Sequence, residues 1–258
     1  MVSENNYSTK LTLNLVDLGI KRQNKFILRH INLEIFSGEI VAIVGRSGIG
    51  KTTLLHAIAG YECPTEGCVL VNGQKIVAPG SERTMIFQSH TLFPWLTVRG
   101  NLKFALRHGK KGSIHSSSRI NSLLERVGLK PYSELYPRQL SGGMQKRTEV
   151  ARAFASVPSV LLADEPFSNN DEVTRRELHK LLFYEWKQTK ATILLSTHDL
   201  EEAVFLANRI LILNGSPARI EKCFDIPFCY PRELSLLQDL SFQETRTEIY
   251  QWILKNSI

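Results

Sequence analysis

Apolar positions along this chain follow two periods, which predict a series of strands and helices. Apolar and polar residues alternate in two early segments, which predicts half-buried strands over 11–18 and 31–35. Uninterrupted apolar runs predict further strands, of which the runs 40–44, 160–163 and 193–195 are typical of strands buried on both faces. Three shorter apolar segments also predict strands, namely 68–71, which runs into an Asn-Gly hairpin turn, 85–87 and 210–213.

Helical periodicity lies between and after these strands. It predicts helices over 53–59, 171–190 and 243–255, and an interrupted helical stretch over 89–157 whose Gly/Ser/Lys-rich part, 109–119, is expected to be an exposed loop. Strands that alternate with helices favour a mainly parallel sheet. The chain is therefore predicted to be an α/β protein with a mainly parallel sheet, an antiparallel β layer and an inserted α-helical subdomain.

Composition narrows the class without naming a function. The 258 residues are 43% apolar and 22% charged, which is ordinary for a globular protein. No apolar run is long enough to span a bilayer, and the polar start at residues 1–6 has no signal-peptide core, so a cytosolic location is expected. The net charge of +7 comes from scattered Lys and Arg, which favours a solvated surface over attraction to nucleic acid or an anionic membrane.

A glycine-rich loop is the strongest single signal. Residues 45–52 read G-R-S-G-I-G-K-T and fit the pattern G-x-x-x-x-G-K-[ST] between a buried strand and a helix. In this P-loop, backbone N–H groups and a helix start cradle phosphates, a lysine charge reaches the outer phosphates, and a Thr hydroxyl suits Mg²⁺. The candidate ATP-binding residues are Gly45, Arg46, Ser47, Gly48, Ile49, Gly50, Lys51, Thr52 and Thr53.

Two acids follow the buried run 160–163. Asp164 is predicted to hold Mg²⁺ through water, and Glu165 to act as general base on the attacking water. A second glycine pair, Gly142-Gly143, follows Ser141, which is a good N-cap for a helix that ends near Pro158. This helix start is either an ordinary Ser-capped helix or a second anion site.

Taken together, these motifs identify a family resemblance. The segment L-S-G-G-M-Q at 140–145 resembles the signature sequence of ATP-binding-cassette (ABC) ATPases, and the other cassette motifs occur in the expected order. Gln88 resembles the Q-loop glutamine, Asp164-Glu165 the Walker B motif with its catalytic glutamate, residues 168–171 the D-loop, and His198 the H-loop histidine. The resemblance covers about 11–215 and implies a P-loop NTPase (RecA-like) fold and ATP hydrolysis.

The resemblance also implies roles for these residues. Glu165, His198 and Gln88 would be catalytic, and Thr52, Gln88 and Asp164 would hold Mg²⁺. Two copies would form a head-to-tail homodimer, in which Ser141, Gly142 and Gly143 of one copy close the ATP site of the other. The chain is expected to form one ATPase domain, 1–258, with a nucleotide-binding core from 1–88 and 158–258 and a helical subdomain, 89–157, that carries the signature.

The segment after Gln88 resembles the nitrate, sulfonate and taurine importer cassettes, with Phe93 before Pro94-Trp95 in place of their leucine. In that family this surface receives the membrane subunit; here Phe93 and Trp95 either do the same or simply pack inside the helical subdomain. The resemblance implies import of a small oxyanion or organosulfur solute with two transmembrane permease subunits and, indirectly, a solute-binding protein. The chain would lie peripherally on the cytoplasmic face of the membrane, without nucleic acid.

Two other functions fit the sequence less well, and two positions depart from the family's usual motifs. A soluble cassette acting on nucleic acid or ribosomes usually has long coiled coils or two cassettes, which this chain lacks, and an exporter or lipid-transfer cassette fits Pro94-Trp95 less well. Arg22 stands where cassettes place an adenine-stacking aromatic, although Arg can stack on a purine and Phe26 is close by. Asn169-Asn170 replaces the usual D-loop pair, and the role of the tail after 215 is open.

Overall fold

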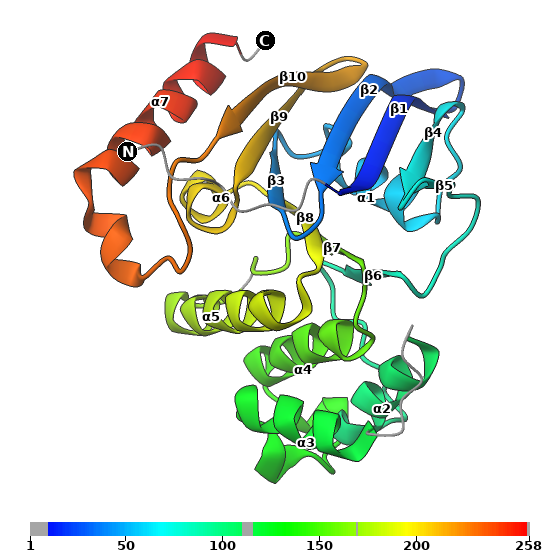
Figure 1. Cartoon of the computed structure of the whole chain (residues 1–258), viewed down its shortest axis with the longest axis vertical. Coiled ribbons are helices and arrows are strands. Elements are labelled where there is room, and N and C mark those ends of the chain that lie inside the picture. Colours follow the sequence, from blue (N-terminus) through cyan, green and yellow to red (C-terminus); the bar gives the residue numbers. More distant parts are fainter. Residues whose placement is uncertain (1–9, 110–115, 169, 257–258) are drawn as a thin grey trace. The chain divides into compact units, whose positions relative to one another are not determined.

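The computed structural model describes residues 10–109, 116–168 and 170–256 (Figure 1). It divides into two compact units, one made of residues 1–79 and 192–258 and the other of residues 80–191. The predicted helical subdomain, 89–157, lies within the second unit, and its boundaries stay a prediction.

The first unit is built on a sheet whose strands lie in the order β5-β4-β1-β2-β10-β9-β3-β8. The central strand β3 pairs in parallel with β8 and β9, whereas the pairs β1–β2, β1–β4, β4–β5 and β9–β10 are antiparallel. The predicted parallel sheet with an antiparallel layer is thus present. The strands are β1 Leu11–Arg22, β2 Lys25–Phe36, β3 Ile40–Val44, β4 Glu66–Val71, β5 Gln74–Lys75, β8 Thr192–Thr197, β9 Arg209–Gly215 and β10 Ala218–Asp225.

Helices of the first unit cover this sheet. Helix α1 starts after Gly50 and stops at Gly60, whose φ of 85° is left-handed and suits glycine. Helix α6 contacts β3 and β8, and α7 packs on α6. Figure 1 shows these two helices beside β9 and β10. The helical segments are α1 Lys51–Ala59, α6 Leu200–Leu206, the 3₁₀ turn Leu234–Gln238 and α7 Leu240–Asn256.

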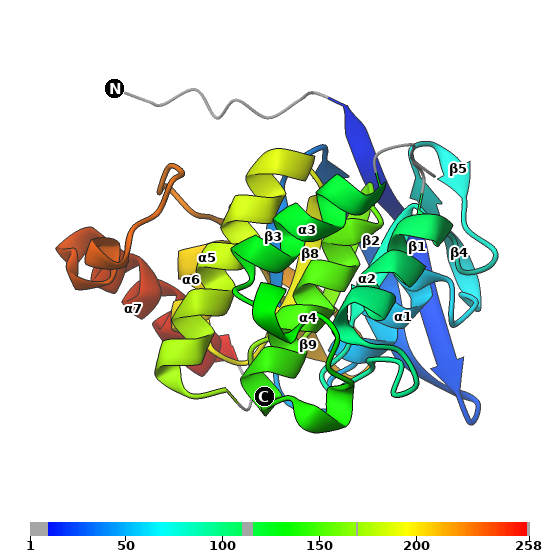
Figure 2. The same ribbon diagram turned by 90° about the horizontal axis from the view of Figure 1, so that it is seen from below.

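The second unit contains the parallel strand pair β6–β7 and a group of helices. Helices α2, α3 and α4 contact one another and α4 also contacts α5, an arrangement visible in Figure 2. The segments are β6 Arg83–Ile86, α2 Val98–His108, α3 Ser116–Arg126, the 3₁₀ turns Lys130–Tyr132 and Pro137–Gln139, α4 Gly142–Ala155, β7 Val160–Asp164 and α5 Glu172–Thr189.

The strands predicted to be buried on both faces are buried throughout. Every residue of β3, β7 and β8 is buried, the acid Asp164 included. Because the last residue of a fully buried strand is fixed by packing on both faces, these strands place the residues that follow them. The segments after β3, β7 and β8 are those that the sequence predicts to form the nucleotide site.

Three expectations differ from the structure. Helix α3 begins at Ser116, inside the predicted loop 109–119, and residues 110–115 of that loop lie outside the described residues. Strand β10 follows β9 as a hairpin that the sequence analysis did not predict, although its residues 218–225 include Ile220 and Phe224 at even spacing. Helix α7 starts at Leu240, three residues before the predicted start at 243.

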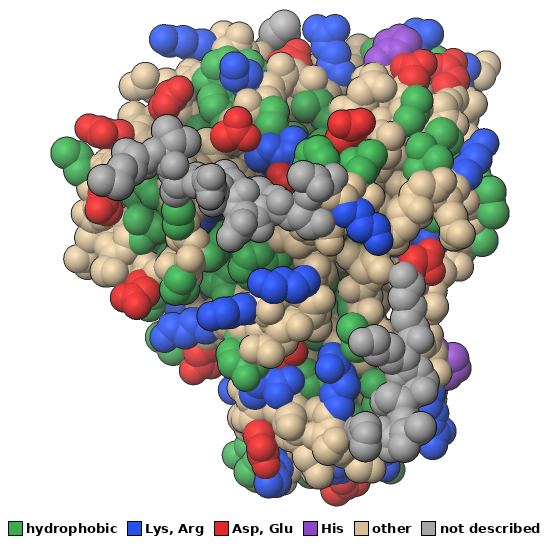
Figure 3. Space-filling view, viewed as in Figure 1, with side chains coloured by type: hydrophobic (Ala, Val, Ile, Leu, Met, Phe, Trp, Pro, Cys, Tyr) green, Lys and Arg blue, Asp and Glu red, His purple; other side chains and the backbone are tan. Residues whose placement is uncertain are grey.

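The surface carries no single dominating charge on the face shown in Figure 3. Lys and Arg side chains there are interleaved with acidic, apolar and uncharged ones. Within the ranges described, no helix combines the length and the apolar character that crossing a membrane requires.

Candidate nucleotide site

The loop between β3 and α1 has the shape of a phosphate cradle. Gly48 and Gly50 have φ of 76° and 113°, in the left-handed region that glycine adopts without strain. No side chain caps the start of α1, so its first N–H groups point into the loop with the positive end of the helix dipole. This is the geometry that binds a phosphate chain.

Lys51 completes the cradle from inside. Its side chain is buried, and its Nζ donates hydrogen bonds to the carbonyl oxygens of Gly45 at 2.8 Å and Arg46 at 3.2 Å. The ammonium group is thus held over the concave side of the loop, where the outer phosphates of a nucleotide would meet it. Thr52, the next residue, is exposed on the first turn of α1.

The first glycine of the loop is required by close packing. A Cβ at Gly45 would lie 2.7 Å from the carbonyl oxygen of Leu213 in β9, a backbone atom that cannot move aside. The loop is therefore packed directly against β9, and any side chain at this position would push the cradle off the sheet.

His198 lies in the same unit as the cradle and lines the same cavity. It follows β8 directly and is exposed, and the cavity of about 610 Å³ is bounded by Gly45, Arg46 and Ser47 on one side and by His198 on another. A cavity of this size is typical of small-molecule sites. The first unit therefore brings together the phosphate cradle and the predicted H-loop histidine.

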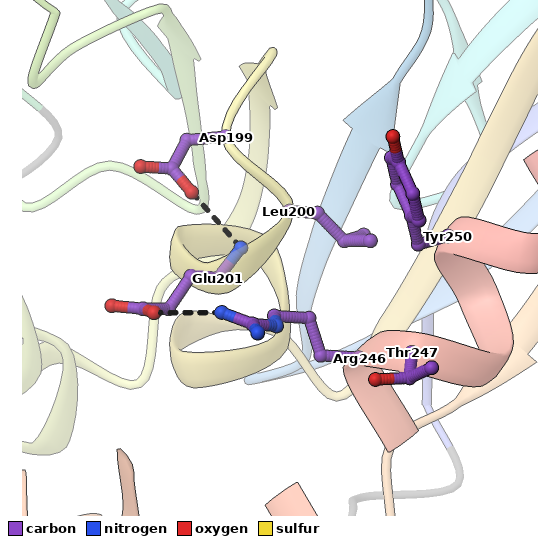
Figure 4. A pocket seen from close by; sticks show the side chains of 6 residues that line it. All are labelled: Asp199, Leu200, Glu201, Arg246, Thr247 and Tyr250. Atoms are coloured by element: carbon purple, nitrogen blue, oxygen red, sulfur yellow. Dashed lines mark hydrogen bonds and ion pairs between the residues drawn. The ribbon is translucent and has the colours of Figure 1, made fainter. Parts of the chain in front are cut away.

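The backbone after His198 is fixed by a strong helix cap. Asp199 accepts hydrogen bonds from the backbone N–H groups of Glu201 and Glu202 at 2.9 and 3.2 Å, which starts α6. Figure 4 shows how α7 holds this turn: Arg246 of α7 pairs with Glu201 at 3.2 Å, and Tyr250 stands opposite Leu200. A second cavity of about 420 Å³ is lined by Asp199, Leu200, Glu201, Arg246, Thr247 and Tyr250.

Gln88, Asp164 and Glu165 lie in the second unit. Asp164 is the buried last residue of β7, and Glu165 follows it, partly exposed, with a φ of 43° that is unusual for a residue with a side chain. The amide Nε2 of Gln88 donates to Glu165 Oε2 at 3.4 Å. The predicted Q-loop glutamine and the predicted catalytic carboxylate are therefore adjacent.

The turn after Glu165 closes on itself and leads into α5. The hydroxyl of Ser168 donates to the Glu165 carbonyl at 2.8 Å, and the Asn170 amide donates to the carbonyl oxygens of Phe167 and Ser168 at 3.2 and 3.1 Å. Asn170 thus stabilises the turn, while Asn169 lies outside the described residues. Asp171 caps α5 by accepting from the Thr174 backbone and hydroxyl, and these hydrogen bonds lower the pKa of its carboxyl.

Ser141 starts α4 as predicted. Its side chain accepts a hydrogen bond from the Met144 N–H at 3.3 Å, and Gly142 is exposed. A Cβ at Gly142 would come no closer than 4.0 Å to its nearest neighbour outside its own helix turn, the His90 side chain, so the described part of the chain leaves this position open. A Cβ at Gly143 would lie 3.1 Å from Thr174, which is a tight contact.

Of the two interpretations of this segment, packing inside the helical subdomain fits Phe93, and a surface that receives another protein fits Trp95. Phe93 is partly buried, with its ring 4.6 Å from that of Phe104 and 5.6 Å from that of Trp95. Trp95 is 71% exposed, which is unusual for so large an aromatic side chain. Phe93, Trp95 and Phe104, which we call the aromatic patch, are thus anchored by Phe93 and present Trp95 to solvent.

Arg22 has a partner in its own chain. It lies at the end of β1 and forms two hydrogen bonds with Glu62, from Nε at 3.1 Å and from Nη2 at 2.7 Å, which raise the pKa of the guanidinium. Both planar faces of a guanidinium remain available in such an in-plane pair, so stacking on a base is compatible with this contact.

Comparisons with known proteins identify the family. The ABC transporter family profile matches residues 28–168. The chain belongs to the ABC transporter family of ATPases. Among its relatives, a nitrate import ATP-binding protein, NrtD of Synechocystis sp., is 45% identical over 81% of this chain and 79% of its own, and an aliphatic sulfonates import ATP-binding protein, SsuB of Bacillus anthracis, is 39% identical over 87% of each.

Solved structures agree with the predicted fold. A dimeric ATP-binding cassette in a post-hydrolysis state, bound to ADP and Pi, superposes with a TM-score of 0.71 at 28% identity and covers 83% of this cassette and 98% of its own chain. CbiO1 of Clostridium perfringens, part of an ABC transporter complex, gives 0.74 at 25% identity, with 84% and 89% covered. The predicted P-loop NTPase fold, ATP binding and ATPase class are confirmed, and the relatives support the predicted class of importer ATPase subunits.

Several residues that pack around the cassette motifs were not predicted from the sequence. The carboxylate that pairs with Gln88 was named, but Tyr250, Ile253 and Asn256 of α7, which line the cavity next to the cradle, were not. The only signal for them was the helical spacing of the terminal segment, which says nothing about its packing partner. Two buried charges of α4, Lys146 and Glu149, were also missed.

Proposed function

We propose that this cassette is the ATP-hydrolysing subunit of an importer for a small oxyanion or organosulfur solute, such as nitrate, a sulfonate or taurine. The class of solute is supported by the relatives of the chain, which are named as nitrate import and aliphatic sulfonates import ATP-binding proteins. The observation that carries the hydrolytic part of the proposal is Glu165, held directly after a buried strand with Gln88 beside its carboxylate.

In the proposed reaction each motif has one task. The cradle N–H groups and Lys51 bind the β- and γ-phosphates and offset the charge that develops on the transferred group. The carboxylate of Glu165 accepts a proton from the water that attacks the γ-phosphorus, and the oxygen–phosphorus bond to ADP breaks. Gln88 and His198 orient that water and the γ-phosphate, so that ADP and inorganic phosphate are the products.

Mg²⁺ fits the oxygen donors that the cassette offers. Thr52, Gln88 and Asp164 provide a hydroxyl, an amide oxygen and a carboxylate, which is the ligand type that Mg²⁺ takes together with substrate phosphates. Within the ranges described there is no group of three His, Cys, Asp or Glu that could hold a metal alone, as expected where phosphates supply part of the shell. When bound, Mg²⁺ neutralises charge on the β- and γ-phosphates.

The assembly is part of the proposal. A head-to-tail homodimer would bring Ser141, Gly142 and Gly143 of one copy to the ATP of the other, which gives a use to a helix start that is open at Gly142 in the described part of the chain. The exposed Trp95 supports docking of two membrane permease subunits at the aromatic patch, and a solute-binding protein would act with them. The cassette would then lie peripherally on the cytoplasmic side of the membrane.

Replacing Glu165 by Gln tests the hydrolytic assignment. The amide keeps the shape but cannot accept the proton, so turnover should fall by about 100-fold or more while ATP affinity is kept. Glu172→Gln on α5, an exposed acid paired with Arg176, is the matched control and should hydrolyse ATP as the parent does. Unchanged turnover of Glu165→Gln would remove this residue from its role.

Reconstitution tests the transport assignment. The cassette is purified with the membrane proteins it captures, placed in vesicles, and assayed for ATP-dependent uptake of nitrate, an aliphatic sulfonate and taurine. Uptake of one of these supports the proposal, whereas capture of ribosomes or DNA in place of a membrane protein would contradict it.

A further inference from the structure

A buried arginine near the end of the chain holds the last turn of helix α6. Arg232 is only 6% exposed. Its Nη1 donates to three carbonyl oxygens at the end of α6, those of Val204 at 2.9 Å, Phe205 at 3.0 Å and Ala207 at 2.8 Å. Its Nε and Nη2 donate to the Phe228 carbonyl at 3.1 and 2.7 Å. One side chain thus joins α6 to residues 226–256, which we call the terminal segment.

The end of a helix is a favourable place for this charge. The last carbonyl oxygens of a helix have no partner within it, and they form the negative end of the helix dipole. Tyr230 adds to the same contact, because its hydroxyl donates to the Leu206 carbonyl at 2.5 Å and its ring lies 4.3 Å from the Arg232 guanidinium. Since Val204, Phe205 and Leu206 are buried, carbonyl oxygens here depend on donors from the protein.

The terminal segment also contacts the other end of α6. There Arg246 pairs with Glu201 at 3.2 Å, beside the Asp199 cap (Figure 4). Both side chains of this pair are more than a third exposed, so the pair contributes little to the stability of the contact. The buried hydrogen bonds of Arg232 are therefore the stronger of the two attachments.

The place of α6 determines the place of His198. A single residue, His198, separates Thr197, the last residue of β8, from Asp199, the N-cap of α6. Thr197 is fixed because β8 is buried throughout, and its hydroxyl accepts from the Asp199 N–H at 3.0 Å. A shift of α6 along β8 therefore moves the backbone of His198. Because His198 lines the same cavity as Gly45, such a shift alters the distance between the imidazole and the cradle.

We propose that Arg232 is a positioning residue for ATP hydrolysis, which fixes the end of α6 and thereby holds His198 in place opposite the phosphate cradle. The inference rests on the proposed function, in which His198 orients the γ-phosphate and the attacking water. It assigns the terminal segment a part in the reaction, through contacts with α6 and without contact with ATP.

Arg232→Met is the first test. Methionine keeps much of the apolar stem but removes the donors to the carbonyl oxygens of α6. Because a small misplacement of a catalytic group is costly, kcat should fall about tenfold or more. KM and Kd for ATP should stay within about threefold of the parent, since the cradle is unchanged. Arg219→Met, which removes an exposed arginine of β10, is the charge control and should match the parent.

A double-mutant cycle shows whether Arg232 acts through His198. Turnover of His198→Ala and of His198→Ala/Arg232→Met is measured as single turnovers with the cassette in excess, so that very slow rates are resolved. If the arginine acts through the histidine, the two rates should agree within about twofold. A further loss of about tenfold in the double variant would overturn the proposal. Parent-like turnover of His198→Ala would instead contradict the proposed function, so the two failures are distinguishable.

Two further variants separate positioning from folding. Arg232→Lys keeps the charge at the helix end with one nitrogen in place of three, so it should fold even if Arg232→Met does not, with kcat lowered about threefold or more at unchanged KM. Leu13→Ala removes a buried leucine of β1 and lowers the unfolding temperature without changing these contacts of α6, so it should keep the parent's kcat. Parent-like kcat in a folded arginine variant would overturn the proposal, as would an equal loss in Leu13→Ala.

Discussion

Glycines stand at the starts of both α1 and α4, but the two helix starts are built differently. The start of α1 has no side-chain cap, and its first residue, Lys51, is buried and donates hydrogen bonds back to the carbonyl oxygens of Gly45 and Arg46 in the preceding loop. The start of α4 is capped by Ser141, and Gly142 beside it is exposed. The first start thus brings its own charge to an anion, whereas the second offers only backbone N–H groups and a hydroxyl.

The space around Gly45, in the loop before α1, is also smaller than the space around Gly142 at the start of α4. A Cβ at Gly45 would lie 2.7 Å from the Leu213 carbonyl, but a Cβ at Gly142 would lie 4.0 Å from its nearest neighbour. Gly45 is glycine because the folded chain leaves no room. Nothing in the described part of the chain requires glycine at 142, so a requirement for glycine there would come from a molecule that binds at this position.

Among changes at the helix starts, the largest effect is expected at Lys51. Lys51→Met removes the charge from the cradle and should weaken ATP binding by about 10- to 100-fold, as for loss of a charged hydrogen bond. Isothermal titration with Mg-ATP measures this, and Lys21→Met, an exposed lysine of β1, is the control. Equal affinity for Lys51→Met and parent would show that the cradle does not depend on its own charge.

Gly142→Ala is the sharpest test of the second helix start. The added methyl meets no neighbour in the chain and replaces a helical glycine, so stability should be unchanged or rise by up to about 1 kcal/mol. ATP hydrolysis should nevertheless fall about tenfold or more, because the methyl covers backbone that a phosphate approaches. Full activity of Gly142→Ala would show that the start of α4 is an ordinary Ser-capped helix start and not an anion site.

A smaller effect is expected at the cap itself. Ser141→Ala removes the hydrogen bond to Met144 and should lower the free energy of unfolding by about 1 kcal/mol. Urea denaturation measures the loss, and Ser141→Thr, which keeps the hydroxyl, should restore most of it. If Ser141→Ala lost activity but no stability, the hydroxyl would serve a ligand and not the helix.

The smallest effect is expected at a third helix start, that of α5, where Asp171 is the cap. Thr174 lowers the pKa of Asp171, so this carboxylate contributes stability above its unfolded-state pKa, near about 4, and the contribution is lost as pH falls through the lower folded-state value. Asp171→Asn should therefore unfold at lower urea than the parent at pH 7, and the difference should shrink below about pH 4. A difference that is constant with pH would contradict capping by the charged form.

Much of this cassette could be predicted because its signals are local. The buried strands β3, β7 and β8 are built on uninterrupted apolar runs, and the segments that follow them contain Lys51, Glu165 and His198. Such runs fix where the strands end, and the ends fix where the chemistry lies. The helix cap at Ser141 was likewise predictable from three residues.

What the sequence does not reveal depends on long-range packing. Lys146 and Glu149 look like ordinary charges of a helix, and only the neighbouring segment at Thr91 makes them buried. The packing of α7 against the turn after His198 is also non-local, since Arg246 bonds to Glu201 across 45 residues. Periodicity reports which face is buried but not against what.

The backbone at Glu165 suggests how this chain would evolve if it lost its function. A φ of 43° is unfavourable for glutamate by about 1 kcal/mol or more, whereas Gly or Asn adopts it readily. We therefore expect the proposed role of Glu165 as general base to keep glutamate at this position against its conformational preference. In a duplicated gene copy released from that selection, position 165 should drift to Asn or Gly early, and either residue there would mark a cassette that no longer hydrolyses ATP.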